Sequence, residues 1–364
     1  FLRDFRGDTV HPSTMEILDQ LGMLDRFLAR PHSRFAQARL TIAGQTMTIG
    51  DLSHLKTPAP FIAMMPQWEF LDFLKSEAAN FPAFKLEMVA DVARLTESGG
   101  RITGVALTDG REIKAGKLVV MADGRSSIVR RDHLLPVTVL GAPMDVFWFS
   151  VPKADDGGDA LRGLVAAGSM MALIDRRDYW QCAYIFPKGM AETLRGEGIG
   201  AMRARIETAA PLLGPLDKVL TDMRQMRLLS VALDRLDCWH RPGLLAIGDA
   251  AHAMSPVGGI GINLAIQDAV ATANLLAGPM REMSNVDKLL HRVEKRRLFP
   301  TLVIQAGQKA AQDRIIGAIF KPGARLDRPA WPLRMLNRFP LLRRIPGRIV
   351  GFGVRRERVS SPEA

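Results

Sequence analysis

The chain has 364 residues, of which 47% are hydrophobic and 24% are charged, and its formal net charge is +11. Its two cysteines, Cys182 and Cys238, show neither a CxxC spacing nor a disulfide framework, so we expect a reducing compartment, the cytoplasm. No apolar run reaches the length of a membrane span, and no nucleic-acid-binding motif or metal site is predicted. These features favour a globular enzyme of two domains with a large shared core.

The first predicted element is a helix that begins near Pro12. Ser13-Thr-Met-Glu16 has the pattern of a capping box, and apolar residues recur at helical spacing up to Leu24. Arg6 stands in the loop before this helix, where an arginine can clamp a phosphate. Gln67 begins a second predicted helix, whose apolar face carries Phe70, Phe73 and Leu74.

Strands dominate the middle of the chain. Residues 85–120 alternate as a β-meander, with turns at Ser98-Gly-Gly100 and Thr108-Asp-Gly110. Beyond Pro136, strand-like runs at 145–151, 178–186 and 223–233 surround a predicted helix at 190–210. Residues 41–66 are expected to lend another piece to that sheet, so the two domains interleave.

Two motifs each join a buried strand to a turn. The first is Leu118-Val-Val-Met-Ala-Asp-Gly-Arg125, in which an apolar strand runs into Asp123-Gly124 and a basic turn. The second is Gly243-Leu-Leu-Ala-Ile-Gly-Asp-Ala-Ala-His252, in which a strand stops at Gly248-Asp249. A helix follows Gly259, and its N-terminus offers unpaired N–H groups. The arrangement indicates a cofactor site.

These residues resemble the FAD-dependent monooxygenases of the para-hydroxybenzoate hydroxylase type. The match is position by position at six residues: Asp249, Pro256, Gly258, Gly261, Ile262 and Asn263. The resemblance implies a mixed α/β fold, in which a Rossmann-like FAD-binding domain is interleaved with an antiparallel-sheet substrate domain. It also implies how the chain is divided. The FAD-binding domain would consist of residues 1–40, 67–135 and 241–300, and the substrate domain of residues 41–66 and 136–240. Residues 301–364 would form a helical basic segment.

The resemblance assigns roles to these residues. Asp249 would meet the ribityl chain of FAD, the N–H groups of Ile262 and Asn263 would face the flavin ring, and Pro256 and Gly258 would shape the loop at the flavin face. The other predicted cofactor-binding residues are Arg6, Gln67, Asp123, Gly124, Arg125, Gly248 and Gly261. No acid or base is assigned.

The activity that the resemblance implies is hydroxylation of an aromatic or other electron-rich apolar substrate. NAD(P)H reduces FAD, oxygen then gives a C4a-hydroperoxide, and the distal oxygen is transferred to the substrate. Tyr179 and Tyr184 are weak candidates for binding a phenol. A reductase or dehydrogenase on the same scaffold, and a non-catalytic remnant, are the alternatives.

Members of this family open with a Gly-x-Gly-x-x-Gly turn that cradles the ADP half of FAD. The chain begins at Phe1 without this turn, so we expect about 35 residues of a βαβ opening to precede it in a complete enzyme. FAD binding by the chain alone is therefore expected to be weak.

The end of the chain is strongly basic. Residues 321–364 hold eleven Lys or Arg and three Asp or Glu, which gives 11 − 3 = +8 of the total charge. Arginines there alternate with large apolar residues. The composition fits either a tail that packs on the parent domain, which we favour, or a peripheral contact with an anionic membrane surface.

Overall fold

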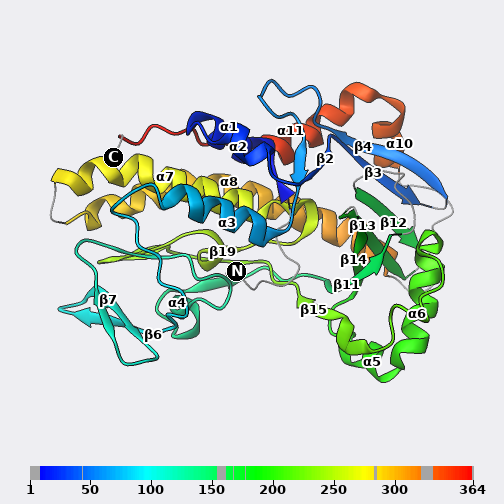
Figure 1. Ribbon diagram of the computed structural model, residues 1–364, viewed down its shortest axis with the longest axis horizontal. Helices are drawn as coiled ribbons and strands as arrows, with labels where there is room; N and C mark the ends of the chain where they lie inside the picture. Colours follow the sequence, from blue (N-terminus) through cyan, green and yellow to red (C-terminus); the bar gives the residue numbers. More distant parts are fainter. Residues whose placement is uncertain are drawn as a thin grey trace.

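The computed structural model describes residues 9–42, 44–153, 161–166, 168–176, 178–282, 285–320 and 331–362. The fold is the expected mixture of helices and sheets, with two long helices side by side and a large sheet at one end (Figure 1). The long helices are α7 (Gly261–Glu282) and α8 (Leu290–Ala311), and both lie between the smaller sheets and the N-terminal helices.

The largest sheet has seven strands in the order β15-β11-β14-β13-β12-β3-β4. Its strands are β3 (Gln37–Ile42), β4 (Gln45–Asp51), β11 (Met144–Pro152), β12 (Leu161–Ala166), β13 (Ser169–Asp175), β14 (Tyr179–Pro187) and β15 (Arg227–Ser230). All neighbours are antiparallel except β12 and β3. Strands β3 and β4 come from an early part of the chain, so an early segment does join this sheet, but with other bounds than the expected 41–66. Residues 52–66 lie outside the sheet, and Ile62–Met64 pairs in another one.

The two faces of this sheet have different neighbours. Phe147, Phe149 and Leu173 share one apolar cluster with helices α5 (Ala191–Gly196) and α6 (Gly198–Ala209). The opposite face includes Val146 and Ala183, which cluster with Val257. Strand alternation therefore directs one set of side chains to α5 and α6 and the other to the loop that precedes α7.

Four three-stranded sheets form the rest of the β structure. The predicted meander is confirmed as β6 (Val92–Ser98), β7 (Arg101–Leu107) and β8 (Glu112–Lys114), but residues 85–91 and 115–120, at its two predicted ends, lie outside it. Strands β17 (His240–Arg241), β18 (Leu244–Ala246) and β9 (Val119–Met121) form another sheet, in which β18 and β9 are parallel. The others are β10 (Val137–Val139), β16 (Asp234–Leu236) and β19 (His252–Ala253), and β1 (Thr9–Val10), β5 (Ile62–Met64) and β2 (Ser33–Phe35).

The N-terminal helix α1 (Pro12–Gln20) begins where the sequence predicts, but its capping box does not form. The N-cap residue is His11, whose side chain makes no capping bond. Thr14 instead donates to Asn263, and Glu16 accepts from Arg356. Long-range partners replace the local cap. Helix α2 (Leu24–Leu28) follows, and α3 (Gln67–Ala78) begins at Gln67 as predicted.

The C-terminal region is helical and packs on the body of the chain. Helices α10 (Trp331–Arg338) and α11 (Arg344–Phe352) both contact β4. The predicted boundary at residue 300 falls inside α8, which accommodates Pro300 and continues through α9 (Gly317–Ile319) by way of a π-helical stretch. Residues 301–311 of the predicted segment are therefore part of a long helix that begins at Leu290.

One described helix, with its preceding turn at 257–282, is long and apolar enough to cross a membrane by length and composition alone. The sequence predicts the helix after Gly259 but no apolar run of membrane-spanning length. It carries the buried polar residues Asn263, Gln267 and Asp268, which bond to other parts of the protein. These contacts are those of a core helix.

Candidate cofactor site

The two strand-turn motifs meet at one edge of a parallel pair of strands. Leu244 lies opposite Val119 in the register of β18 and β9. Because both strands run in the same direction, Asp123 and Asp249, which follow them, stand at the same carboxyl edge. Ligands bind at this edge in open α/β sheets.

Arg125 connects the two turns. Its Nε lies 3.4 Å from an Asp249 carboxylate oxygen, and its second terminal nitrogen donates to the Met254 carbonyl at 3.4 Å. The Asp249 side chain is 34% exposed, so its carboxylate remains open to a ligand. Asp123 accepts a bond at 3.0 Å from the N–H of Ile128, the first residue of α4 (Ile128–Arg131). Asp123 therefore orders the start of that helix.

A fully buried carboxylate holds the second turn. Asp268 on α7 accepts from the Gly248 N–H at 3.0 Å, lies 2.7 Å from His252 Nε2, and accepts from Arg297 Nε at 2.8 Å. Burial disfavours its charged form, but His252 and Arg297 outweigh burial and lower the pKa of Asp268. Glu357 lies 3.1 Å from the same guanidinium. His252 thus has a structural partner.

The loop before α7 approaches the N-terminal segment closely. Gly258 has a φ of +82°, and Gly259 has a φ of +61° with the Thr9 hydroxyl against it, 2.3 Å from where a Cβ would stand. Left-handed backbone and close contact both favour glycine here. The loop ends at Gly261, and α7 begins with the N–H groups of Ile262 and later residues, which lack acceptors within the helix.

The Asn263 side chain ties this loop to the N-terminus. Its carbonyl oxygen accepts from the His11 N–H at 2.9 Å and from the Thr14 hydroxyl at 2.8 Å. Its amide group donates to the Thr9 carbonyl at 3.1 Å and to the Gly259 carbonyl at 3.2 Å. The sequence predicts a role only for the backbone N–H of Asn263, and the side chain has this additional role.

Several buried polar atoms near these elements have no hydrogen-bond partner among the described residues. They include a terminal nitrogen of Arg125, the Gln67 side-chain oxygen, the Ser127 hydroxyl and His252 Nδ1. Gln67 opens α3, and Phe70, one turn later, shares an apolar cluster with Ile262. Buried polar groups are costly to leave unpaired, so a polar ligand beside them is favoured. The residue set fits FAD. Arg6, the remaining predicted contact, lies outside the described residues.

The two tyrosines point in different directions. Tyr184 is buried in the cluster that faces α5 and α6, away from the loop, and burial raises the pKa of its phenol. Tyr179 lines a cavity of about 250 Å³ with Trp68, Glu69 and Arg176. A role for Tyr184 in holding a substrate beside the flavin loop therefore does not fit the geometry.

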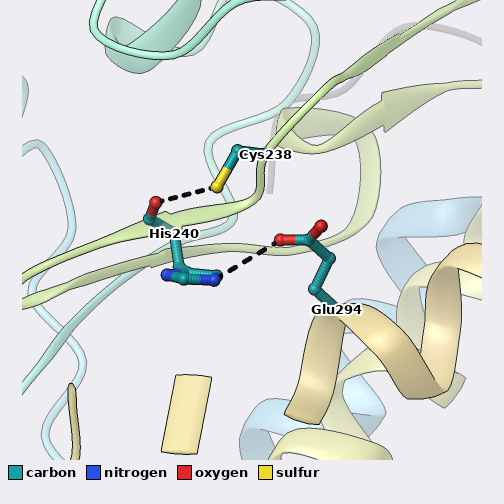
Figure 2. Close-up of side chains that lie close together, drawn as sticks. All are labelled: Cys238, His240 and Glu294. Carbon is teal, nitrogen blue, oxygen red and sulfur yellow. Dashed lines mark hydrogen bonds and ion pairs between the residues drawn. The ribbon is translucent and has the colours of Figure 1, made fainter. Parts of the chain in front are cut away.

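A cluster of Cys238, His240 and Glu294 lies beside the cofactor turn. Figure 2 shows the three side chains directed toward one another, with Glu294 on α8, and their ligand-type atoms lie within 4.8 Å of each other. Cys238 donates to the His240 carbonyl at 3.2 Å, and Glu294 lies 3.6 Å from the imidazole while accepting the Trp239 N–H at 3.0 Å. The Trp239 ring lies 5.1 Å from that of His252. These hydrogen bonds explain why the three side chains lie together, and the cluster packs beside the turn that ends at His252.

Comparison with known proteins identifies the class. Residues 1–307 match the FAD binding domain family, and the chain belongs to it. Several of its relatives are named as monooxygenases, and the protein is an FAD-dependent oxidoreductase of the aromatic monooxygenase class.

Among these relatives, the 6-methylpretetramide 4-monooxygenase of Streptomyces rimosus is 30% identical and is matched over 89% of this chain and 80% of its own length. An uncharacterized aromatic compound monooxygenase, YhjG of Bacillus subtilis, is 24% identical over 75% of this chain, which spans only 54% of that relative. The structure of PqsL, a probable FAD-dependent monooxygenase from Pseudomonas aeruginosa, has a TM-score of 0.72 at 20% identity and covers 87% of this chain and 89% of that one. At this identity, the similarity to PqsL shows that the two chains share a fold.

Proposed function

We propose that this protein is an NAD(P)H-driven monooxygenase that uses FAD and molecular oxygen to hydroxylate an aromatic or other electron-rich apolar substrate. The observation that carries the proposal is the convergence of three segments. The Asp123–Arg125 turn, the Gly248–Asp249 turn and the first turn of α7 stand together at the carboxyl edge of β9 and β18.

Each segment suits a different part of FAD. Asp249 pairs with Arg125 at 3.4 Å and is partly exposed, so its carboxylate can accept hydrogen bonds from ribityl hydroxyls. The unpartnered nitrogen of Arg125 can donate to the pyrophosphate. Gln67, whose side-chain oxygen also has no partner, would lie near the ribityl chain.

The start of α7 suits the charge of a reduced flavin. The N–H groups of Ile262 and Asn263 and the positive end of the helix dipole favour an anionic ring edge. Pro256 and Gly258 shape the loop on the same side. Reduced FAD, when bound, supplies the oxygen-activating chemistry by the route that the sequence resemblance implies.

The sheet face beyond this loop suits an apolar substrate. Val257 packs against a cluster formed by apolar residues of three strands, Met144, Val146, Ala183, Leu229 and Val231. Such a wall excludes water from the reacting groups and offers few polar contacts. The S. rimosus relative is named a 6-methylpretetramide 4-monooxygenase and the B. subtilis relative an aromatic compound monooxygenase, which supports an aromatic substrate for this chain. Two free cysteines, Cys182 and Cys238, support a cytoplasmic location.

The first test is an FAD titration, followed by flavin absorbance and fluorescence quenching. It uses the purified chain and a form extended at its N-terminus by a Gly-x-Gly-x-x-Gly βαβ segment. We expect tight binding in the extended form, and about ten- to hundredfold weaker binding in its Asp249→Ala variant. Asp313→Ala, at an exposed ion pair on the π-helical stretch, is the matched control and should bind like the parent. Absence of flavin in both forms would refute the proposal.

A second measurement distinguishes a monooxygenase from a reductase on the same scaffold. NAD(P)H oxidation and oxygen uptake are followed together while aromatic compounds are screened. One oxygen molecule consumed per hydroxylated product supports the proposal. Product formation without oxygen uptake would identify a reductase instead.

A further inference from the structure

The outward side of the C-terminal helices carries large apolar residues that stay exposed in the part of the chain that the structure describes. They are Trp331 (68% exposed), Met335 (40%), Phe339 (48%), Leu341 (68%), Ile345 (60%) and Ile349 (43%). We call these six residues the apolar stripe. Figure 1 shows α10 at the upper edge of the molecule, above β3 and β4, and α11 between β4 and the N-terminal helices. Six such residues within one short segment mark an interaction surface.

The inner side of the same helices is already occupied. Leu333 packs into a cluster with Leu40 and Met47, and Gly351 lies against Leu52 and Leu55. A Cβ on Gly347 would stand 1.9 Å from the Asp51 carbonyl, so α11 rests directly on the end of β4. Packing therefore fixes which side of the helices faces outward, and the apolar stripe is not an unpacked core.

A basic stripe runs beside the apolar one. Arg334 and Arg338 are spaced four residues apart on α10, as are Arg344 and Arg348 on α11, and all four are exposed. Residues 331–356 contain no Asp or Glu. None of these four arginines forms an ion pair within the part of the chain that the structure describes. The surface therefore combines exposed apolar side chains with uncompensated positive charge.

We propose that this surface docks the protein on an anionic phospholipid bilayer, with the apolar stripe inserted among the acyl chains and the arginines at the headgroups. Helices that lie in a membrane interface present this pairing, with Trp, Phe and Leu on one side and basic residues beside them. A protein partner would be expected to leave mixed charges around an apolar patch, whereas anionic lipid complements a surface of one sign. The proposal does not depend on the flavin reaction.

The test is co-sedimentation of the full chain with vesicles. One set is pure phosphatidylcholine and the other is phosphatidylcholine mixed with phosphatidylglycerol. We expect binding to the anionic vesicles, weakened by high salt, and little binding to the neutral ones. Replacing Arg334, Arg338 and Arg344 together by Gln should lower partitioning about a hundredfold, since each arginine contributes roughly fivefold.

Apolar contact is tested separately by Leu341→Glu combined with Ile345→Glu. This variant should lose vesicle binding while its circular dichroism and FAD binding stay unchanged, because both side chains are largely exposed. Phe81→Glu with Met88→Glu is the matched control, at apolar residues that are 54% and 53% exposed in another part of the chain, and it should bind vesicles normally.

Three outcomes would overturn the proposal. The first is no binding to either vesicle, and the second is equal binding to both. The third is a dimer in size-exclusion chromatography that Leu341→Glu disrupts, without vesicle binding, which would assign the surface to a second copy of the chain. Because FAD binding is measured in the same variants, failure here is distinguishable from failure of the proposed function.

Discussion

Replacing Asp268 by Asn should strongly destabilise the protein, because it removes the buried carboxylate that holds the Gly248–Asp249 turn. The carboxylate is fully buried and is contacted by the Gly248 N–H, by His252 and by Arg297. Asparagine keeps the shape but loses the charge, and its amide group turns a donor toward groups that themselves donate. The Arg297 side chain, which is 0% exposed, then has only Glu357 as a charged partner.

Breaking a buried ion pair on one side costs about 3–5 kcal/mol, because the remaining charge stays buried. We expect the lower end, about 3 kcal/mol, since Glu357 still lies 3.1 Å from the Arg297 guanidinium. The same change should weaken FAD binding, because the Gly248 N–H loses an acceptor and the turn before Asp249 loosens.

The assay is urea unfolding at neutral pH, with the free energy of unfolding compared between variants of equal m-value. Asp313→Asn is the matched control, because its carboxylate pairs with Lys309 at 2.9 Å while both side chains are about half exposed. An exposed pair of this kind contributes about 0.5 kcal/mol or less. A loss below about 1 kcal/mol in Asp268→Asn would refute the reasoning.

The pH dependence of this contribution has a fixed sign. The pKa of Asp268 is lowered in the folded state, where His252 and Arg297 outweigh the effect of burial. Its contribution to stability is therefore complete above the unfolded pKa of about 4 and is lost as the pH falls through the lower folded value. The Asn variant should lack this part of the acid transition.

Three further predictions concern other parts of the chain. Burial lowers the pKa of His11 from 6.5 to about 4, so the free energy of unfolding should fall by about 3 kcal/mol as the pH drops from 6.5 to 4. In urea titrations, the His11→Gln variant should show a flatter dependence of this free energy on pH. Equal pH profiles of the variant and the parent would contradict the prediction. Gly259→Ala should cost more stability in urea unfolding than Gly44→Ala, because both have positive φ but only the first meets a neighbouring side chain; equal costs would refute the steric argument. Ellman's reagent should modify Cys238 in the folded protein but Cys182 only on unfolding, because Cys182 is buried and burial raises the pKa of its thiol more than that of Cys238. Simultaneous reaction of the two thiols would argue against this prediction.

Elements with a strong local pattern were predictable from the sequence. The strand at 244–246 and the helix that follows Gly259 are where periodicity places them, and α3 begins at Gln67. Strands β12 and β13 were not predicted as separate elements. Their residues, 161–175, form an apolar stretch interrupted by glycine, whose pattern is ambiguous until neighbouring strands pair with it.

The capping box shows a limit of local reasoning. Ser13-Thr-Met-Glu16 fits the pattern, yet Thr14 donates to Asn263 and Glu16 accepts from Arg356. A buried long-range partner replaces a local bond that water would weaken. The exposed face of the C-terminal helices is a similar case, because the sequence gives its composition and only packing against β4 decides which residues face outward.

The sequence by itself determined the type of site, because glycines, an aspartate and a helix start stand at fixed short spacings that the local backbone requires. It also determined the positive charge of the C-terminal segment. The tertiary structure decided which distant groups hold that site. Asp268 and Arg297 are 29 positions apart, and Arg297 and Glu357 are 60 apart. Buried charges must find partners wherever the fold places them, and no local pattern encodes that meeting.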